Sequence, residues 1–323
     1  MAPLPIGADP HDVALTISSH TPRRLPDVAH ELALMARPLD WVGMARLALP
    51  MRIATDSGEP IQVAASVDVA VDLRDANARG IHMSRMYLQL QDAFARETVT
   101  PAGLRRVLQT LIESQGGLSS RARLVLRYEH LLLRQALASG NAGWKRYPVE
   151  IEASLIDGHL HLGLRFAVEY SSTCPASAAL SRQLNADRFV EDFADTRPLA
   201  GAIHEWLVSE RGLAATPHAQ RSRADVRVQL RPAFEELPLT ALIDAVEEEL
   251  GTPVQTAVKR EDEQAFARLN AENLMFCEDA ARRVAAALAN DPRIERFDAE
   301  VAHFESLHAH DAVARVTGEG PRQ

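Results

Sequence analysis

The stretch Val149-Glu-Ile-Glu-Ala-Ser-Leu-Ile-Asp-Gly-His-Leu-His-Leu-Gly-Leu-Arg-Phe-Ala-Val-Glu-Tyr170 decides the fold class of this chain. Apolar and polar residues alternate on both sides of Asp157-Gly158, which is typical of two strands that each bury one face. An Asp-Gly pair between two such runs is a strong signal for a tight hairpin, because both residues tolerate a positive φ. The stretch therefore predicts two long, neighbouring strands of an antiparallel sheet.

The chain before this hairpin predicts two strands, two helices and two further strands. Residues 61–73 alternate clearly, and the turn-rich segment 55–60 separates them from an earlier alternating run. Pro101 suits the first turn of a helix that runs to Gly116-Gly117. The expected elements are strands at 44–53 and 61–73, helices that begin near 83 and 100, and strands at 121–128 and 149–155.

The chain after the hairpin repeats this layout without repeating its residues. The helix expected at 239–250 has one apolar face and ends at Gly251, a typical C-terminal cap. The expected elements are helices through about 211, a strand at 222–230, helices at 239–250 and 276–290, and final strands between 297 and 316. The predicted class is α+β, with antiparallel sheets and paired helices.

Three parts are expected along the chain. Residues 1–38 contain several prolines and little periodicity, so they predict a partly ordered N-terminal arm. Residues 39–170 form a first module, and residues 171–323 form a second module that carries most candidate site residues. The start of the chain has no basic n-region and no apolar h-region, so we expect no secretory signal, and no apolar run is long enough to cross a bilayer. We therefore expect a soluble cytoplasmic protein.

The composition excludes some classes of partner. The 323 residues carry a formal net charge of −9, which is a poor balance for general binding to nucleic acid or to a membrane surface. A local basic cluster could still hold a small phosphorylated ligand. The two cysteines are too few for a disulfide framework, so a reducing compartment is expected.

Four short polar segments, far apart in the chain, each carry a candidate metal ligand or proton donor. They are residues 171–177, 216–222, 259–263 and 305–310. A thiolate, an imidazole and a carboxylate together bind a catalytic divalent metal and leave one position open for water. If the fold gathers Cys174, His218 and Glu263, the protein is a metal-dependent hydrolase. Each also has an ordinary interpretation: an idle thiol, a loop histidine and a solvated charge run.

Other polar residues suggest ligand contacts. Glu278 lies in the first turn of a predicted helix, where it either stabilises the helix N-terminus or accepts two parallel N–H groups of a guanine. Glu305, His308 and His310 lie on a predicted strand, whose two-residue spacing puts both histidines on one face, either as proton carriers or as a solvent-facing stripe. The remaining candidates are polar groups beside His218 (Gln220, Arg221, Ser222) and groups for an anion (Lys259, Arg260, His82, Arg85).

No spacing here is a local metal motif, but the segments in their joint order resemble the prokaryotic type IB GTP cyclohydrolases. The resemblance covers most of the chain and rests on the four polar segments together with residues 40–44, 80–85, 273–280 and 306–312. The family often has Cys-Pro-Cys where this chain has Cys174-Pro-Ala176, so Cys174 is the only candidate thiolate at the motif. The stretch between Cys174 and His218 is also longer than in short family members.

The resemblance implies a tunnelling fold, built from tandem modules of two strands, two helices and two strands, in a toroidal homo-oligomer. A homotetramer with active sites at subunit interfaces is expected. The implied reaction converts GTP and water to formate and 7,8-dihydroneopterin triphosphate, the first step of folate biosynthesis, by a hydrolase that acts on a cyclic amidine C–N bond.

The resemblance also implies roles for individual residues. Cys174, His218 and Glu263 would hold one divalent metal, which could be zinc, manganese or iron(II). Glu278 would anchor the guanine edge. Proton transfer is expected from His308 and His310, supported by Glu305. The triphosphate and the rest of the substrate are assigned to Lys259, Arg260, Arg85, His82 and Arg221.

Two alternatives stay open at this point. A 7-deazaguanine nitrile reductase on the same fold would use Cys174 as a covalent nucleophile, with NADPH and without a metal. A non-catalytic purine-binding protein would be unaffected by a chelator.

Overall fold

The computed structural model describes residues 31–322 except 56–57 and 232–233. Most of the predicted N-terminal arm, residues 1–30, lies outside the described residues. Its last residues pair with the loop that follows β2, because Ala33 and Arg37 donate backbone hydrogen bonds to Asn77 and Ala76 at 2.8 and 3.0 Å. In the described part of the chain, no helix is long and apolar enough to cross a membrane.

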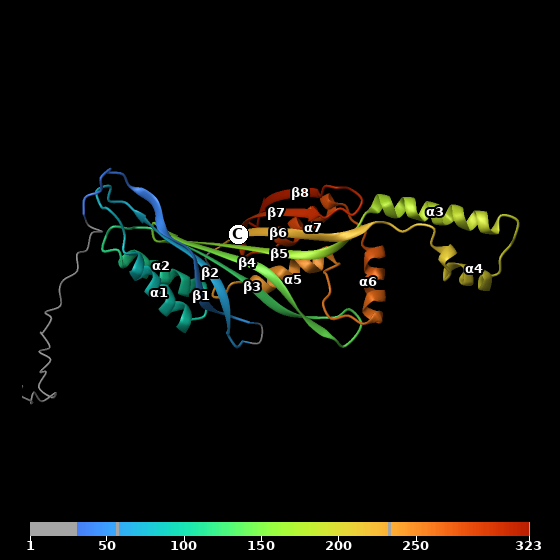
Figure 1. Ribbon diagram of the computed structural model, residues 1–323, viewed down its shortest axis with the longest axis horizontal. Helices are drawn as coiled ribbons and strands as arrows, with labels where there is room; N and C mark the ends of the chain where they lie inside the picture. Colours follow the sequence, from blue (N-terminus) through green and yellow to red (C-terminus); the bar gives the residue numbers. More distant parts are fainter. Residues whose placement is uncertain (1–30, 56–57, 232–233, 323) are drawn as a thin grey trace, which may run out of the picture.

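The strands of the described residues form one antiparallel sheet of eight strands in sequence order. Consecutive strands are neighbours throughout, so the sheet is a continuous meander (Figure 1). The strands are β1 (Leu39–Ile53), β2 (Ile61–Leu73), β3 (Ala122–Gln135), β4 (Ala142–Ile156), β5 (His159–Thr173), β6 (Ala219–Leu230), β7 (Ile294–His303) and β8 (Ala312–Glu319). This arrangement confirms the α+β class with an antiparallel sheet.

Seven α-helices and one short 3₁₀ helix lie between these strands in the same described residues. They are α1 (Met83–Arg96), α2 (Pro101–Glu113), α3 (Pro175–Phe193), α4 (Ala200–Leu207), η1 (Glu210–Gly212), α5 (Leu239–Leu250), α6 (Arg260–Glu272) and α7 (Cys277–Ala289). The expected order of two strands, two helices and two strands is therefore observed in β1 to β4. The same order recurs in β5 to β8, with α5 and α7 as the paired helices and extra elements between them. The division into modules at residue 170 stays a prediction.

The predicted hairpin joins the two halves. Ile156 pairs with His159, and the two turn residues have positive φ angles, 51° at Asp157 and 76° at Gly158. Gly158 adopts this conformation without strain because it has no Cβ. The turn fixes the register of β4 and β5, so the apolar sets of both strands face the same side of the sheet.

The core lies between that apolar face and four helices. Helices α1 and α2 pack on the first four strands, and α5 and α7 pack on β5, β7 and β8 (Figure 1). One continuous cluster of buried side chains extends from Leu49 on β1 to Val301 on β7. Each fully buried Leu or Val contributes about 1.5–3 kcal/mol by leaving water. An ion pair between Lys145 and Glu247, 2.6 Å apart and buried, also ties β4 to α5.

The sequence signals correctly predict the start of α2 and the end of α5, but they do not predict α6. Thr100 caps α2 by accepting a hydrogen bond from Gly103 N at 3.0 Å, and Gly251 ends α5 in the left-handed region with φ of 74°. The charge run after Lys259 is the first turn of α6 rather than a plain solvated segment. Its carboxylates, of which Asp262 caps the Lys259 backbone N–H at 2.8 Å, are the expected signal of a helix start.

An arm of α3, α4 and η1 leaves the sheet after β5 and returns at β6. Figure 1 shows this arm extending past the end of the sheet. Few of its side chains are buried, and the rings of Phe189, Phe193 and Trp206 pack together with centroids 4.9 to 6.1 Å apart. The arm therefore has a small apolar cluster of its own, separate from the main core.

Candidate active site

Cys174 and His218 meet at one end of the sheet. The last pair between β5 and β6 joins Thr173 to Ala219, so the residues that follow and precede these strands are neighbours. The Cys174 backbone N–H donates to the His218 carbonyl at 3.3 Å. The whole arm thus closes as a loop between two of the predicted site residues.

Local structure links both residues to the first turn of α3. Cys174 is the N-cap of α3, and its Sγ accepts from Ser177 N at 3.5 Å, with Pro175 in the first helical turn. The His218 backbone N–H donates to Ser177 Oγ at 3.1 Å. The first turn of α3 therefore holds Cys174 and the backbone of His218 next to each other, and both residues are partly exposed.

A carboxylate approaches the same imidazole from a third segment. Glu305 Oε2 lies 3.9 Å from His218 Nδ1, and its side chain is 12 % exposed. Phe304 N donates to the Arg221 carbonyl at 3.1 Å, which is the last contact of this segment with β6. The end of the sheet therefore gathers a thiol, an imidazole and a carboxylate from the starts of α3 and β6 and the end of β7.

The predicted strand through Glu305, His308 and His310 is wrong. These residues lie in the connection between β7, which ends at His303, and β8, which starts at Ala312. Polar and small residues follow Glu305 in place of an alternating apolar set, so the segment has no apolar face to bury against the helices. The two imidazole rings still stack, with centroids 5.1 Å apart and planes 12° apart, and both are exposed.

Glu278 belongs to the same end of the molecule. Met275 N donates to the Thr173 carbonyl at 3.2 Å, and this contact brings the start of α7 beside the end of β5. Glu278 lies in the first turn of α7, as predicted, and is exposed. Its neighbour Cys277 is buried, its Sγ donates to the Val301 carbonyl at 3.3 Å, and burial raises its pKa to about 11. Cys277 is therefore a packed thiol and not a nucleophile.

Glu263 lies apart from Cys174 and His218 within one chain. The start of α6 is held at the β3–β4 hairpin, because Asp262 accepts from Ala138 N and Ser139 N at 2.8 Å and from Ser139 Oγ at 2.6 Å. The other end of α6 is the one near β5. A helix rises about 1.5 Å per residue, so Glu263 is about 15 Å along α6 from that end.

Among residues 31–322 without the two short gaps, no three His, Cys, Asp or Glu side chains of a single chain lie close enough to hold a metal ion. Within one chain the structure brings Cys174 and His218 together but not Glu263. The three-residue metal-ligand set therefore stays a prediction.

Most basic candidates also lie elsewhere in the chain. His82 and Arg85 are at the start of α1, and Figure 1 shows α1 and α3 at opposite ends of the molecule. Arg85 donates to the Ser114 carbonyl at 2.9 Å, and the His82 backbone N–H donates to Gln115 at 2.8 Å. Lys259 and Arg260 are at the start of α6, next to Glu263. Arg221 on β6 is exposed and shares the sheet end with Cys174.

A set of buried polar residues behind His218 was only partly foreseen. Gln220 and Ser222 were noted as candidate donors, whereas Ser172, Tyr170 and His303 were not singled out. All five are buried on the face of the sheet that the helices cover. The available signal was polar residues at alternate positions of two strands, where the pattern calls for apolar ones.

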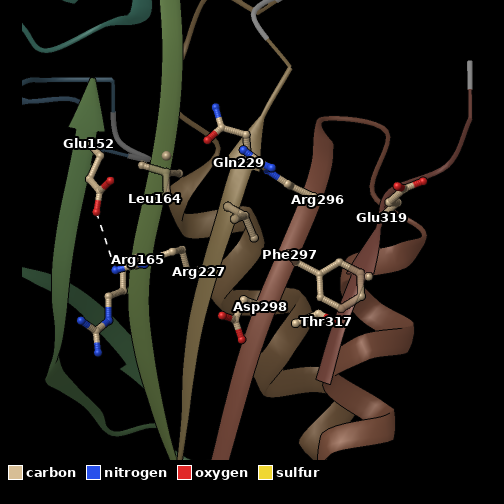
Figure 2. A pocket seen from close by; sticks show the side chains of 13 residues that line it. Glu152, Leu164, Arg165, Arg227, Gln229, Arg296, Phe297, Asp298, Thr317 and Glu319 are labelled. Atoms are coloured by element: carbon tan, nitrogen blue, oxygen red, sulfur yellow. Dashed lines mark ion pairs between the residues drawn. The ribbon is translucent and has the colours of Figure 1, made fainter. Parts of the chain in front are cut away.

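A well-formed cavity lies away from this cluster. It measures about 540 Å³ and lies over β4 to β8, where Figure 2 shows Arg165, Arg227 and Asp298 on the strands with α-helices behind them. Arg227 reaches Glu152 across β5 at 3.7 Å. None of the predicted site residues lines this cavity. Cys174, His218 and Glu305 are at the sheet end instead.

Fold and site together define a class. The protein has an antiparallel α+β fold whose sheet end gathers thiol, imidazole and carboxylate side chains, which are the groups that act as nucleophiles and proton carriers in enzyme active sites.

Comparison with known proteins gives the family. The family model described as type I GTP cyclohydrolase folE2 matches residues 25–314, and the chain belongs to this GTP cyclohydrolase family. The chain is 48% identical over 294 residues to a GTP cyclohydrolase FolE2 of Pseudomonas putida (strain GB-1), covering 91% of this chain and 96% of that protein.

Among solved structures, the chain is similar to two uricases. The uricase of Arthrobacter globiformis is 12% identical, with a TM-score of 0.45 over 88% of this chain and 96% of the other. The uricase of Bacillus fastidious is 8% identical, with a TM-score of 0.45 over 86% and 93% of the two chains.

Proposed function

We propose that this protein is a type IB GTP cyclohydrolase that converts GTP and water to formate and 7,8-dihydroneopterin triphosphate, the first step of folate biosynthesis. The observation that carries the proposal is the 48% identity to a GTP cyclohydrolase FolE2 across 91% of the chain. The matched residues 25–314 include all four polar segments. The meeting of Cys174 and His218 supports a hydrolytic site at the sheet end.

Cys174 and His218 would hold a divalent metal, either zinc, manganese or iron(II). The two side chains fit this role, because they are adjacent, partly exposed and of the donor types that such metals accept. When bound, such a metal lowers the pKa of a water ligand from 15.7 to about 7, which makes water a nucleophile at neutral pH. The carboxylate ligand in the proposal is Glu263.

Glu263 reaches the site from a neighbouring subunit in this proposal. Within one chain, α6 holds Glu263 at the β3–β4 hairpin, about 15 Å from the helix end that lies near Cys174. In the part of the chain that the structure describes, the outer edges of β1 and β8 form no ladder with another strand, which leaves both able to pair with other chains. A toroidal homotetramer of the tunnelling fold, with sites at the interfaces, would use these edges. His82, Arg85, Lys259 and Arg260 would reach the substrate in the same way.

Glu278 binds the guanine edge. A carboxylate accepts two parallel N–H bonds, and guanine presents such a pair at N1 and its exocyclic amine. The position in the first turn of α7 suits a carboxylate, because the helix N-terminus stabilises negative charge. Glu278 also lies at the sheet end that carries Cys174, so the purine would be held beside the thiol and imidazole.

His308, His310 and Glu305 move protons. Opening the imidazole ring of the purine and releasing formate both require protons at ring nitrogens, and imidazoles exchange protons near neutral pH. The stacked, exposed rings of His308 and His310 are free to face a substrate, and Glu305 approaches His218 to 3.9 Å. Arg221, on the same sheet end, offers a positive charge to the triphosphate despite the net charge of −9.

The test is a direct assay. Metal-stripped protein reconstituted with manganese or zinc is incubated with GTP, and formate and the neopterin fluorophore that appears after oxidation are both measured. We expect both products in equal amounts and none with a chelator. NADPH oxidation with a 7-deazaguanine nitrile, or turnover that survives the chelator, would overturn the proposal.

Mixed oligomers test the shared site. Subunits with Cys174→Ala and subunits with Glu263→Gln are inactive separately, and they are unfolded and refolded together in equal amounts. A site built from two subunits recovers about a quarter of the wild-type activity, because one site in four combines both intact residues. If both ligands came from one chain, the mixture would stay inactive.

A further inference from the structure

A chain of buried hydrogen bonds runs from His218 into the sheet. His218 Nδ1 lies 3.0 Å from Gln220 Oε1, and the Gln220 amide nitrogen donates to Ser172 Oγ at 3.0 Å. Ser172 Oγ lies 2.8 Å from Ser222 Oγ. Gln220, Ser172 and Ser222 are all buried, with Ser172 opposite Gln220 in the register of β5 and β6. The Gln220 amide is therefore held between a hydroxyl and an imidazole, out of bulk water.

The other end of this chain is a second histidine. Ser222 lies opposite Tyr170 in the register of β5 and β6, and the Tyr170 hydroxyl lies 2.9 Å from His303 Nε2. Ser222 pairs with both of these residues, with Tyr170 on β5 and with His303 on β7. Tyr170 and His303 are buried, and their rings meet edge to face with centroids 5.8 Å apart. This series of hydrogen bonds thus crosses three strands, and its inner end does not reach solvent.

Burial determines which groups in this series of hydrogen bonds donate and which accept. Burial raises the pKa of Tyr170 well above its ordinary value, so the hydroxyl keeps its hydrogen and donates it. Burial also lowers the pKa of His303 against the pull of Glu305 and Glu278, so this imidazole is neutral and can accept at Nε2. At the outer end, the Gln220 amide nitrogen donates to Ser172 Oγ, which is free to donate in turn to Ser222 Oγ.

With its N–H group on Ser172, the Gln220 amide faces His218 with its oxygen. An amide oxygen only accepts, so the hydrogen of this bond belongs to His218 Nδ1. The Glu305 carboxylate, 3.9 Å from the same nitrogen, favours a hydrogen there as well. A neutral imidazole carries one hydrogen, so Nε2 keeps a free lone pair.

We propose that Gln220 is a positioning residue that locks His218 in the Nδ1–H tautomer and so presents Nε2 as the nitrogen for the metal. A histidine that binds a metal donates its other ring N–H to an oxygen, and loss of that oxygen weakens metal binding about 10- to 100-fold. The use of Nε2 for a metal rests on the proposed function. The tautomer itself is a property of the metal-free chain and is tested without turnover.

The first measurement is the tautomer. Metal-free protein with ¹⁵N-labelled histidine is studied by NMR at about pH 8, where neutral imidazoles dominate, and the His218 signals are identified with His218→Ala. We expect a hydrogen on Nδ1 and none on Nε2. A His218 ring with its hydrogen on Nε2 in the wild type would overturn the proposal.

Matched variants separate positioning from packing. Gln220→Leu removes the acceptor and keeps the volume, so we expect a shift toward the Nε2–H form and zinc binding weakened about 10- to 100-fold in competition with a chromogenic chelator. Gln220→Glu keeps an oxygen against Nδ1, so the wild-type tautomer and zinc affinity within a few-fold are expected. Ser172→Ala frees the amide to turn, and a partial shift is expected even if Gln220→Leu does not fold.

Two results would remove the role of Gln220. One is an unchanged His218 tautomer in both Gln220→Leu and Ser172→Ala. The other is a changed tautomer with unchanged zinc affinity. A failure of the proposed function would look different: the wild type would show the Nδ1–H tautomer and bind zinc, yet release no formate from GTP.

Discussion

The two halves of the chain share one plan and differ in their connections. In the first half, short loops join β1 to β2 and α1 to α2. In the second half, the arm of α3, α4 and η1 separates β5 from β6, and α6 separates α5 from α7. The three proposed metal ligands lie in these two long connections, with Cys174 and His218 at the ends of one and Glu263 in the other. The sheet and paired helices are thus the scaffold, and the three proposed metal ligands lie in the insertions.

The largest expected effect comes from removing a proposed metal ligand in one of the two insertions. We expect Cys174→Ala to lose bound metal and at least about 10³-fold in turnover, because the attacking water is no longer activated. Metal content, formate release and oligomer size are the measurements. Cys277→Ala is the matched control, since that buried thiol packs in the scaffold, and it should keep metal and turnover. Full activity of Cys174→Ala would contradict the metal site.

Truncating a buried side chain in the scaffold should lower the stability of the protein by a similar amount in either half. Leu108 on α2 and Leu288 on α7 are both fully buried in the same core cluster. Each Leu→Ala change is expected to reduce the free energy of unfolding by about 2–5 kcal/mol, through lost burial and the cavity left behind. Denaturant unfolding measures this, and turnover of the folded variants should stay near wild type. A folded Leu288→Ala protein without activity would show that the second-half scaffold does more than support the insertions.

Loss of the proposed contact between Glu278 and the guanine edge should have an effect of intermediate size. Glu278→Gln should weaken GTP binding to the metal-free protein about 10- to 100-fold, because an amide cannot accept two N–H bonds as a carboxylate does. Calorimetry with GTP and with inosine triphosphate, which lacks the exocyclic amine, measures both affinity and selectivity. The variant should lose the preference for GTP. Asp279→Asn, a change in the same helical turn, should leave both affinities unchanged.

The smallest expected effect concerns the arm. Hydrogen bonds from Arg211 and Trp206 lower the pKa of Asp192 to about 2. A carboxylate with a lowered folded-state pKa stabilises the fold fully above its unfolded pKa of about 3.9, and this contribution is lost as the pH falls toward 2. The arm should therefore loosen between about pH 4 and 2.

Fluorescence of Trp206, in a background with Trp41→Phe and Trp144→Phe, reports this change. Asp192→Asn should remove the pH-dependent part of the signal. The same acid transition in both proteins would mean that Asp192 does not hold the arm.

Local signals predicted most elements of the scaffold. Asp157-Gly158 gave the central hairpin, Pro101 the start of α2, and Gly251 the end of α5. Each of these signals acts within a few residues, through a positive φ, a missing N–H or a cap. The errors fell in the connections of the second half. The charge run at Lys259 hid the start of α6, and the histidine segment after β7 is a loop because no alternating apolar set continues past His303.

The sequence by itself determined the class of elements, their order and, through the order of its polar segments, the resemblance to a family. Only the tertiary structure decided which polar side chains meet. The register of β5 and β6 brings Cys174 to His218, and the burial of one sheet face lines up Gln220, Ser172 and Ser222 behind the imidazole. Turn and helix preferences depend on neighbours in the chain. Contacts between distant residues depend instead on strand register and on which faces exclude water. Glu263 lies elsewhere because the hydrogen bonds of Asp262 hold the start of α6 at the β3–β4 hairpin.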